Sequence, residues 1–113
     1  MQPMLVAEGR VVCPALSVAD TAPSRMKGLL GRRSLDAGEG LLLRPAGSVH
    51  TAFMRFPIDV VFLDRDLRVL RVKHAVVPWR VAACRGARAV LELPRDEAAR
   101  AGLRTGDQLR LDA

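Results

Sequence analysis

The stretch that decides the fold is IDVVFLDRDLRVLRV, residues 58–72. Residues 58–63 are apolar except for Asp59 and do not alternate with polar residues, which is typical of a strand buried on both faces. The DRD at residues 64–66 can turn the chain, and the VLRV at residues 69–72 can return it. The stretch therefore predicts a central β-hairpin whose first strand lies in the core.

Short extended segments separated by Pro and Gly surround this hairpin. They are LVAEGRVV (5–12), ALSVAD (15–20), GLLLRPAG (40–47), AVVPWRVAA (75–83), ARAVLEL (87–93) and the end of LRTGDQLRLDA (103–113). Two helices are predicted, one from Asp20 or Thr21 to Gly31 and one within PRDEAARAG, residues 94–102. Many short strands with two brief helices predict a mainly β (α+β) protein, a single compact β-barrel or jelly-roll-like sandwich with two short helices.

The length of 113 residues fits one domain with one core, residues 1–113. No stretch approaches the roughly 18 to 20 consecutive apolar residues of a membrane span, and the N-terminus lacks the layout of a signal peptide. We therefore expect a soluble, cytoplasmic protein with no membrane span. Cys13 and Cys84 have no metal-type spacing, and free thiols are expected rather than a disulfide.

The net charge of +6 is concentrated in the middle of the chain, where residues 44–88 carry nine Lys or Arg against three Asp. Arg guanidinium groups match carboxylates and phosphates. A basic face could attract an anionic small ligand or an acidic protein segment, or it could simply be solvated. Nucleic-acid binding is a weaker alternative, because three Phe, one Trp and no Tyr leave few side chains for base stacking.

Asp59 needs a partner if its strand is buried, because an unpaired carboxylate in the core costs several kcal/mol. Arg55 is near in sequence, His50 could fold back, and Arg32 or Arg33 could arrive from the end of the first helix. The alternative is a structural carboxylate, in an ion pair or capping a turn. His50 could act as acid, base or ligand, or could be an ordinary hydrogen-bonding residue.

No pattern in the sequence indicates a metal or cofactor. The His, Cys, Asp and Glu residues lack zinc-finger or HExxH spacing, and GLLGR and GEG match no phosphate-binding loop. Trp79 beside Arg80 could be an exposed anchor for a partner, or a half-buried residue at a strand edge. We therefore predict no catalytic residues, no metal and no cofactor from spacing alone.

Several motifs together resemble one protein family. They are GLLGR (28–32), GLLL (40–43), HTAFMRFPIDVVFLD (50–64), PWR (78–80), VLELP (90–94) and GLRTGDQL (102–109). In this order, over about residues 20–112, they resemble the prokaryotic domain of unknown function 192. The resemblance implies a mainly β, jelly-roll-like or barrel-like single domain and no established activity. It also implies that the characteristic positions of the family are occupied here by Gly28, Arg32, His50, Met54, Arg55, Pro57, Asp59 and Glu92.

The leading hypothesis is a non-catalytic binding or accessory module. Its candidate ligand-binding residues are Arg32, His50, Arg55, Asp59 and Glu92, which would line one polar pocket for an anionic ligand or an acidic partner. The alternative is an acid-base hydrolase that uses His50 with Asp59 or Glu92.

Overall fold

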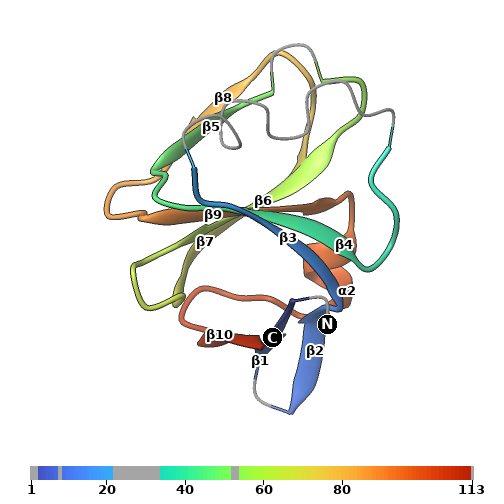
Figure 1. Ribbon diagram of the computed structural model, residues 1–113. Coiled ribbons are helices and arrows are strands. Elements are labelled where there is room, and N and C mark those ends of the chain that lie inside the picture. Colours follow the sequence, from blue (N-terminus) through green and yellow to red (C-terminus); the bar gives the residue numbers. More distant parts are fainter. Residues whose placement is uncertain (1–2, 8, 22–33, 52–53, 113) are drawn as a thin grey trace.

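The central layer of the protein is a five-stranded sheet (Figure 1). Its strands lie side by side in the order β3 (Ala15–Ala19), β4 (Glu39–Leu43), β9 (Ala89–Pro94), β6 (Ile58–Leu63) and β7 (Val69–Val76). β3 runs parallel to β4, and all other neighbouring strands of this sheet are antiparallel. The computed structural model describes residues 3–7, 9–21, 34–51 and 54–112.

Smaller units lie on the two sides of this sheet (Figure 1). On one side, β1 (Met4–Ala7) pairs with both β2 (Arg10–Cys13) and β10 (Leu109–Asp112), and the short helix α2 (Glu97–Arg100) lies nearby. On the other side, β5 (Ser48–His50) and β8 (Val81–Ala83) form a two-stranded ribbon. We call these the terminal side and the ribbon side of the central sheet.

The two middle strands contribute alternate side chains to two cores. All six residues of β6 and all six of β9 are buried. Val61, Leu63, Leu91 and Leu93 belong to the terminal-side core, together with residues of β1, β2, β10 and α2. Ile58, Val60, Phe62 and Val90 belong to the ribbon-side core, together with Val49 and Ala82 of the ribbon. The prediction that the first hairpin strand is buried on both faces is confirmed.

The mainly β prediction is also confirmed. Across the described ranges of the chain, the strands form three sheets that do not close into a barrel, so the layered sandwich is the nearer of the two predicted architectures. The segment LVAEGRVV, predicted as one strand, forms β1 and β2, because the chain turns at Gly9 with a left-handed φ of 70°. The three-residue strand β5 was not predicted, since Ser48–His50 is too short to show a period.

The second predicted helix is confirmed as α2, which begins at Glu97 and ends at Arg100. Most of the first predicted helix, from residue 22 onward, lies outside the described residues. In the part of the chain that the structure describes, no helix has the length and apolar character needed to span a membrane.

Candidate functional site

The carboxylate of Asp59 is fully buried on the terminal side of the central sheet. Its Oδ1 accepts a hydrogen bond from the backbone N–H of Ala75 at 2.9 Å, and its Oδ2 accepts one from the backbone N–H of Ala98 at 3.0 Å. Nδ1 of the exposed His74 lies 4.0 Å from Oδ2. Asp59 therefore joins three elements, β6, β7 and α2.

Both backbone amides need an acceptor for reasons set by the local structure. The register between β6 and β7 shifts at Asp59, so two residues of β7, His74 and Ala75, face this one residue. Such a bulge leaves an amide without its strand partner, and Ala75 adopts a left-handed φ of 51°. Ala98 lies in the first turn of α2, where amides have no partner within the helix, and the preceding Asp96 makes no side-chain cap. The Asp59 carboxylate therefore accepts a hydrogen bond from the free amide of the bulge and caps the N-terminus of α2.

The partners expected for Asp59 from the sequence are thus corrected. His50 and Arg55 make no hydrogen bond or ion pair with it, and Arg32 and Arg33 lie outside the described residues. The alternative of a structural carboxylate describes the arrangement better, with the difference that the capped element is a helix far along the chain. Sequence could not show this, because Ala98 carries no polar side chain.

Glu92 lies on the opposite face of the same sheet. Its cross-strand neighbours are Leu41 of β4 and Val60 of β6, which both belong to the ribbon-side core. The residue is 2% exposed, and burial raises the pKa of its carboxyl group from the ordinary 4.5 to about 7. Asp59 and Glu92 therefore project into different cores, and the expectation that they share one pocket is wrong.

Thr51, the residue after β5, organises the end of the ribbon and is 1% exposed. Its N–H donates to the carbonyl of Arg80 at 2.7 Å, and its Oγ1 donates to the carbonyl of Val77 at 2.7 Å. Its Oγ1 also accepts from the N–H of Arg80 at 2.8 Å. Its carbonyl accepts from the N–H groups of Trp79 at 3.0 Å and Met54 at 3.2 Å. Thr51 thereby holds the 77–80 turn against the chain that leads into β6.

Two of the predicted site residues, His50 and Arg55, lie at this Thr51-centred end. His50 pairs with Val81 across the ribbon, and both residues are exposed. Arg55 is also exposed and follows Met54, whose amide bonds to Thr51. Among the described residues no hydrogen bond joins His50 to Asp59 or Glu92. The geometry therefore does not assemble the acid-base pairs considered for a hydrolase.

The two cysteines are free, as expected, with Cys13 buried and Cys84 half-buried. Burial raises the pKa of the Cys13 thiol to about 11, so this side chain stays protonated at neutral pH and is a poor nucleophile. Within the described ranges, no group of three His, Cys, Asp or Glu side chains could hold a metal ion.

A hollow of about 530 Å³ lies at one end of the central sheet, where β3, β4 and β6 end and β9 begins. We call it the arginine hollow. It is lined by Asp20, Arg44, Pro45, Asp64, Arg65, Leu67, Arg88 and Ala89. Sequence reasoning missed this grouping, because its three arginines are at least twenty residues apart along the chain and meet only through strand pairing.

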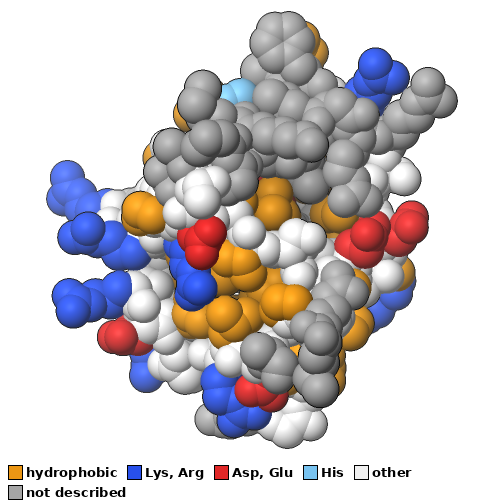
Figure 2. Space-filling view, viewed as in Figure 1, with side chains coloured by type: hydrophobic (Ala, Val, Ile, Leu, Met, Phe, Trp, Pro, Cys, Tyr) orange, Lys and Arg blue, Asp and Glu red, His pale blue; other side chains and the backbone are white. Residues whose placement is uncertain are grey.

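Two of the three guanidinium groups in the arginine hollow have no acidic partner among the described residues. Arg65 and Arg88 are exposed, and within the described residues neither forms an ion pair. Oδ1 of the adjacent Asp64 accepts hydrogen bonds from the amides of Asp66 at 2.8 Å and Arg68 at 2.9 Å, which fixes the β6–β7 turn. Figure 2 shows several Lys and Arg side chains projecting from one edge of the molecule.

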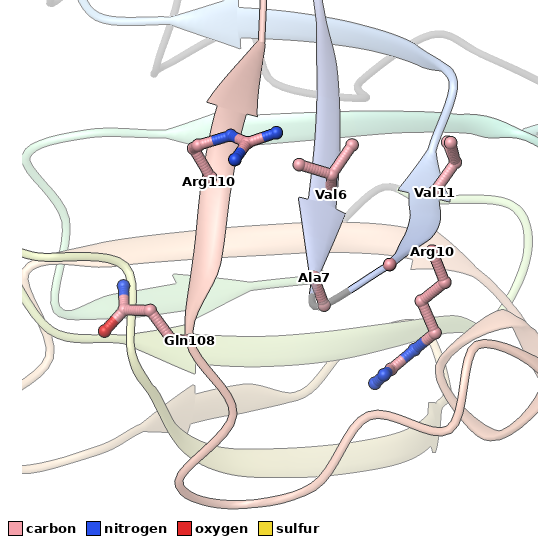
Figure 3. Close-up of a pocket in the computed structure, with 7 residues that line it drawn as sticks. Val6, Ala7, Arg10, Val11, Gln108 and Arg110 are labelled. Carbon is pink, nitrogen blue, oxygen red and sulfur yellow. The ribbon is translucent and has the colours of Figure 1, made fainter.

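A second hollow, of about 410 Å³, lies on the three-stranded sheet between Val6, Val11 and Arg110 (Figure 3). Both of its arginines are already paired. Arg10 lies 3.3 Å from the carboxylate of Asp107, and Arg110 lies 3.0 Å from that of Asp112. This hollow therefore offers less uncompensated positive charge than the arginine hollow.

Comparisons with known proteins agree on an uncharacterised family. The family profile described as "Uncharacterized ACR", domain of unknown function 192, matches residues 5–111. A curated "UPF0127 protein" from Thermococcus sibiricus is 33% identical over 92 residues, which cover 77% of this chain and 59% of that protein. The chain therefore spans less than two thirds of the length of this relative.

Two solved structures are similar in fold. A protein of unknown function from Novosphingobium aromaticivorans has a TM-score of 0.83 and 25% identity, covering 96% of this chain and 82% of that one. A "putative transcription regulator" from Sinorhizobium meliloti has a TM-score of 0.83 and 23% identity, covering 96% of this chain and 90% of that one. The resemblance to domain of unknown function 192 seen in the sequence is confirmed. The family match begins at residue 5, whereas the sequence motifs began near residue 20.

Replacing Asp59 tests its structural role. We expect Asp59→Ala to lower the free energy of unfolding by about 3 kcal/mol, because the buried amide of Ala98 and the partly buried amide of Ala75 both lose their acceptor. Asp66→Ala, on the exposed turn of the same hairpin, is the matched control and should change stability by less than about 0.5 kcal/mol. Chemical denaturation measures both. Equal stability of the two variants would show that Asp59 does not hold the bulge and the helix.

Glu92 makes a separate prediction about pH. Below pH 4.5 its carboxyl group is protonated in both the folded and the unfolded chain and does not affect the unfolding equilibrium. Between pH 4.5 and about 7 the unfolded chain releases this proton while the folded chain keeps it, so stability falls as pH rises. The loss reaches about 3 kcal/mol and is constant above pH 7.

The difference in unfolding free energy between Glu92→Gln and the unchanged protein isolates this effect, because the contributions of the other titrating groups are the same in both proteins. We expect the variant to gain relative stability steadily from pH 4.5 to 7. Two parallel stability curves over that range would mean that Glu92 titrates normally in the folded protein.

Proposed function

This chain belongs to the uncharacterised family of domain of unknown function 192, and for this member we propose a non-catalytic binding module that holds a small organic anion in the arginine hollow. The observation that carries the proposal is the gathering of Arg44, Arg65 and Arg88 in one hollow of about 530 Å³. This volume is in the range of small-molecule sites in proteins.

The chemistry of the hollow favours a carboxylate or a phosphate with a small apolar part. Guanidinium groups bind both kinds of anion through paired, charge-assisted hydrogen bonds. Pro45, Leu67 and Ala89 supply apolar surface beside these charges. Three arginines against two aspartates leave the hollow positive, and Asp64 is already engaged with backbone amides.

The proposal is limited to binding because the lining side chains suit recognition rather than proton transfer. Arginine does not give up its proton in proteins near neutral pH. Among the described residues that line the hollow there is no histidine. His50, considered in the sequence as an acid or base, lies on the exposed face of the β5–β8 ribbon.

Inorganic phosphate and succinate are suitable probes, titrated at constant ionic strength while the amide signals of Arg88 and Ala89 are followed by NMR. We expect saturable shifts at these amides with at least one probe, and the stronger of the two identifies the preferred anion. Arg65→Gln/Arg88→Gln should weaken binding at least about tenfold, because two charged hydrogen-bond donors are lost.

Arg71→Gln is the matched control. Arg71 is exposed on β7 outside the hollow, so this change removes a like charge without altering the site. Binding in this variant should remain within about twofold of the unchanged protein, since distant exposed charges are screened. The proposal fails if neither probe saturates, or if Arg71→Gln weakens binding as much as the double variant does.

A further inference from the structure

Three large apolar residues within five positions of the chain are exposed at the Thr51-centred end of the ribbon. Val77 is 45% exposed, Trp79 is 61% exposed and Val81 is 75% exposed. Within the described residues Val11, on β2, is the other large hydrophobic residue with comparable exposure. Several exposed large apolar residues close together in one segment, unlike a single one, are typical of an interaction site.

The backbone that carries this exposed group is held by hydrogen bonds to Thr51. Trp79 has a left-handed φ of 66°, which is uncommon and costly for a bulky residue. The carbonyl of Thr51 accepts from the amide of Trp79, and the Thr51 hydroxyl binds the backbone of Val77 and Arg80 on either side. The buried Thr51 therefore fixes a strained turn that keeps the indole substantially in solvent. Strained, over-determined backbone of this kind concentrates at sites of binding.

The chain that carries these apolar residues is basic. Residues 73–81 contain Lys73, His74 and Arg80, with no Asp or Glu. Arg55 and Arg80 are exposed close to Trp79, since the amides of Met54 and Trp79 bind the same Thr51 carbonyl. His50 lies across the ribbon from Val81. The complementary partner is therefore negatively charged and has an apolar layer within reach.

We propose that the Thr51-centred end docks on the surface of an anionic lipid bilayer, with Val77, Trp79 and Val81 entering the headgroup region. Trp is enriched where water meets the acyl chains, and Lys and Arg near an anionic leaflet add attraction that needs no fixed register. A stable protein interface buries roughly 800 Å² from each partner, far more than three side chains provide. The arginine hollow is lined by none of these residues, so this site is independent of the proposed anion site.

The protein carries its own probe for this proposal, because Trp79 is its single tryptophan. Vesicles of phosphatidylcholine with phosphatidylglycerol should shift the tryptophan emission to shorter wavelength and sediment the protein, and vesicles of phosphatidylcholine alone should do neither. Added salt should weaken the binding. Arg80→Gln should weaken vesicle binding about fivefold, because the variant loses the attraction of one basic side chain to the anionic membrane surface.

Val77→Ser/Val81→Ser removes apolar contact while keeping the reporting tryptophan, and we expect binding at least about tenfold weaker. Val11→Ser is the matched control, because Val11 is 52% exposed on the opposite side of the central sheet. It should bind within about twofold of the unchanged protein, as expected for a residue away from the contact. Denaturation curves establish that each variant is folded at the assay temperature.

Three outcomes would overturn the proposal. One is no binding of the folded, unchanged protein to the anionic vesicles at low salt. Another is an equal loss of binding in Val11→Ser and in the Val77→Ser/Val81→Ser variant. The third is a larger emission shift and tighter binding with polyglutamate than with vesicles, which would assign this end to an acidic protein segment.

Discussion

Burial of β6 and β9 on both faces is the constraint on which the rest of the structure depends. Every residue of these two strands is buried, so water must be excluded from both sides of the central sheet. The three-stranded sheet and α2 cover the terminal side, and the β5–β8 ribbon contributes to the cover on the other side. Units from distant parts of the chain are therefore brought together around one hairpin.

The two buried carboxylates show how differently the two sides treat a polar group. Asp59 lies beside a bulge and a helix terminus, which both present backbone amides without a partner in their own element. Its carboxylate is therefore part of the framework. Glu92 projects among apolar side chains, and burial disfavours its charge. Two carboxyl groups on neighbouring strands therefore meet different surroundings. One face of the sheet supplies backbone amides as hydrogen-bond donors, and the other supplies apolar side chains.

The groups available for binding lie at the ends of strands rather than within the central sheet. The arginine hollow is built mostly from residues just after β3, β4 and β6 and at the start of β9. The apolar turn at the end of the ribbon is held by Thr51, at the end of β5. Connections on a rigid scaffold are where binding residues are usually found. The two proposals therefore use the same frame at separate places.

The sequence by itself determined the mainly β class, the central hairpin with its doubly buried first strand, and the family. It also showed that Asp59 needs a partner, because a local apolar pattern is enough to predict burial. Only the tertiary structure decided that the partners are the amides of Ala75 and Ala98, and that Glu92 projects to the other face. The physical reason is that side-chain alternation is a local property, while register, bulges and the meeting of distant loops depend on which strands pair.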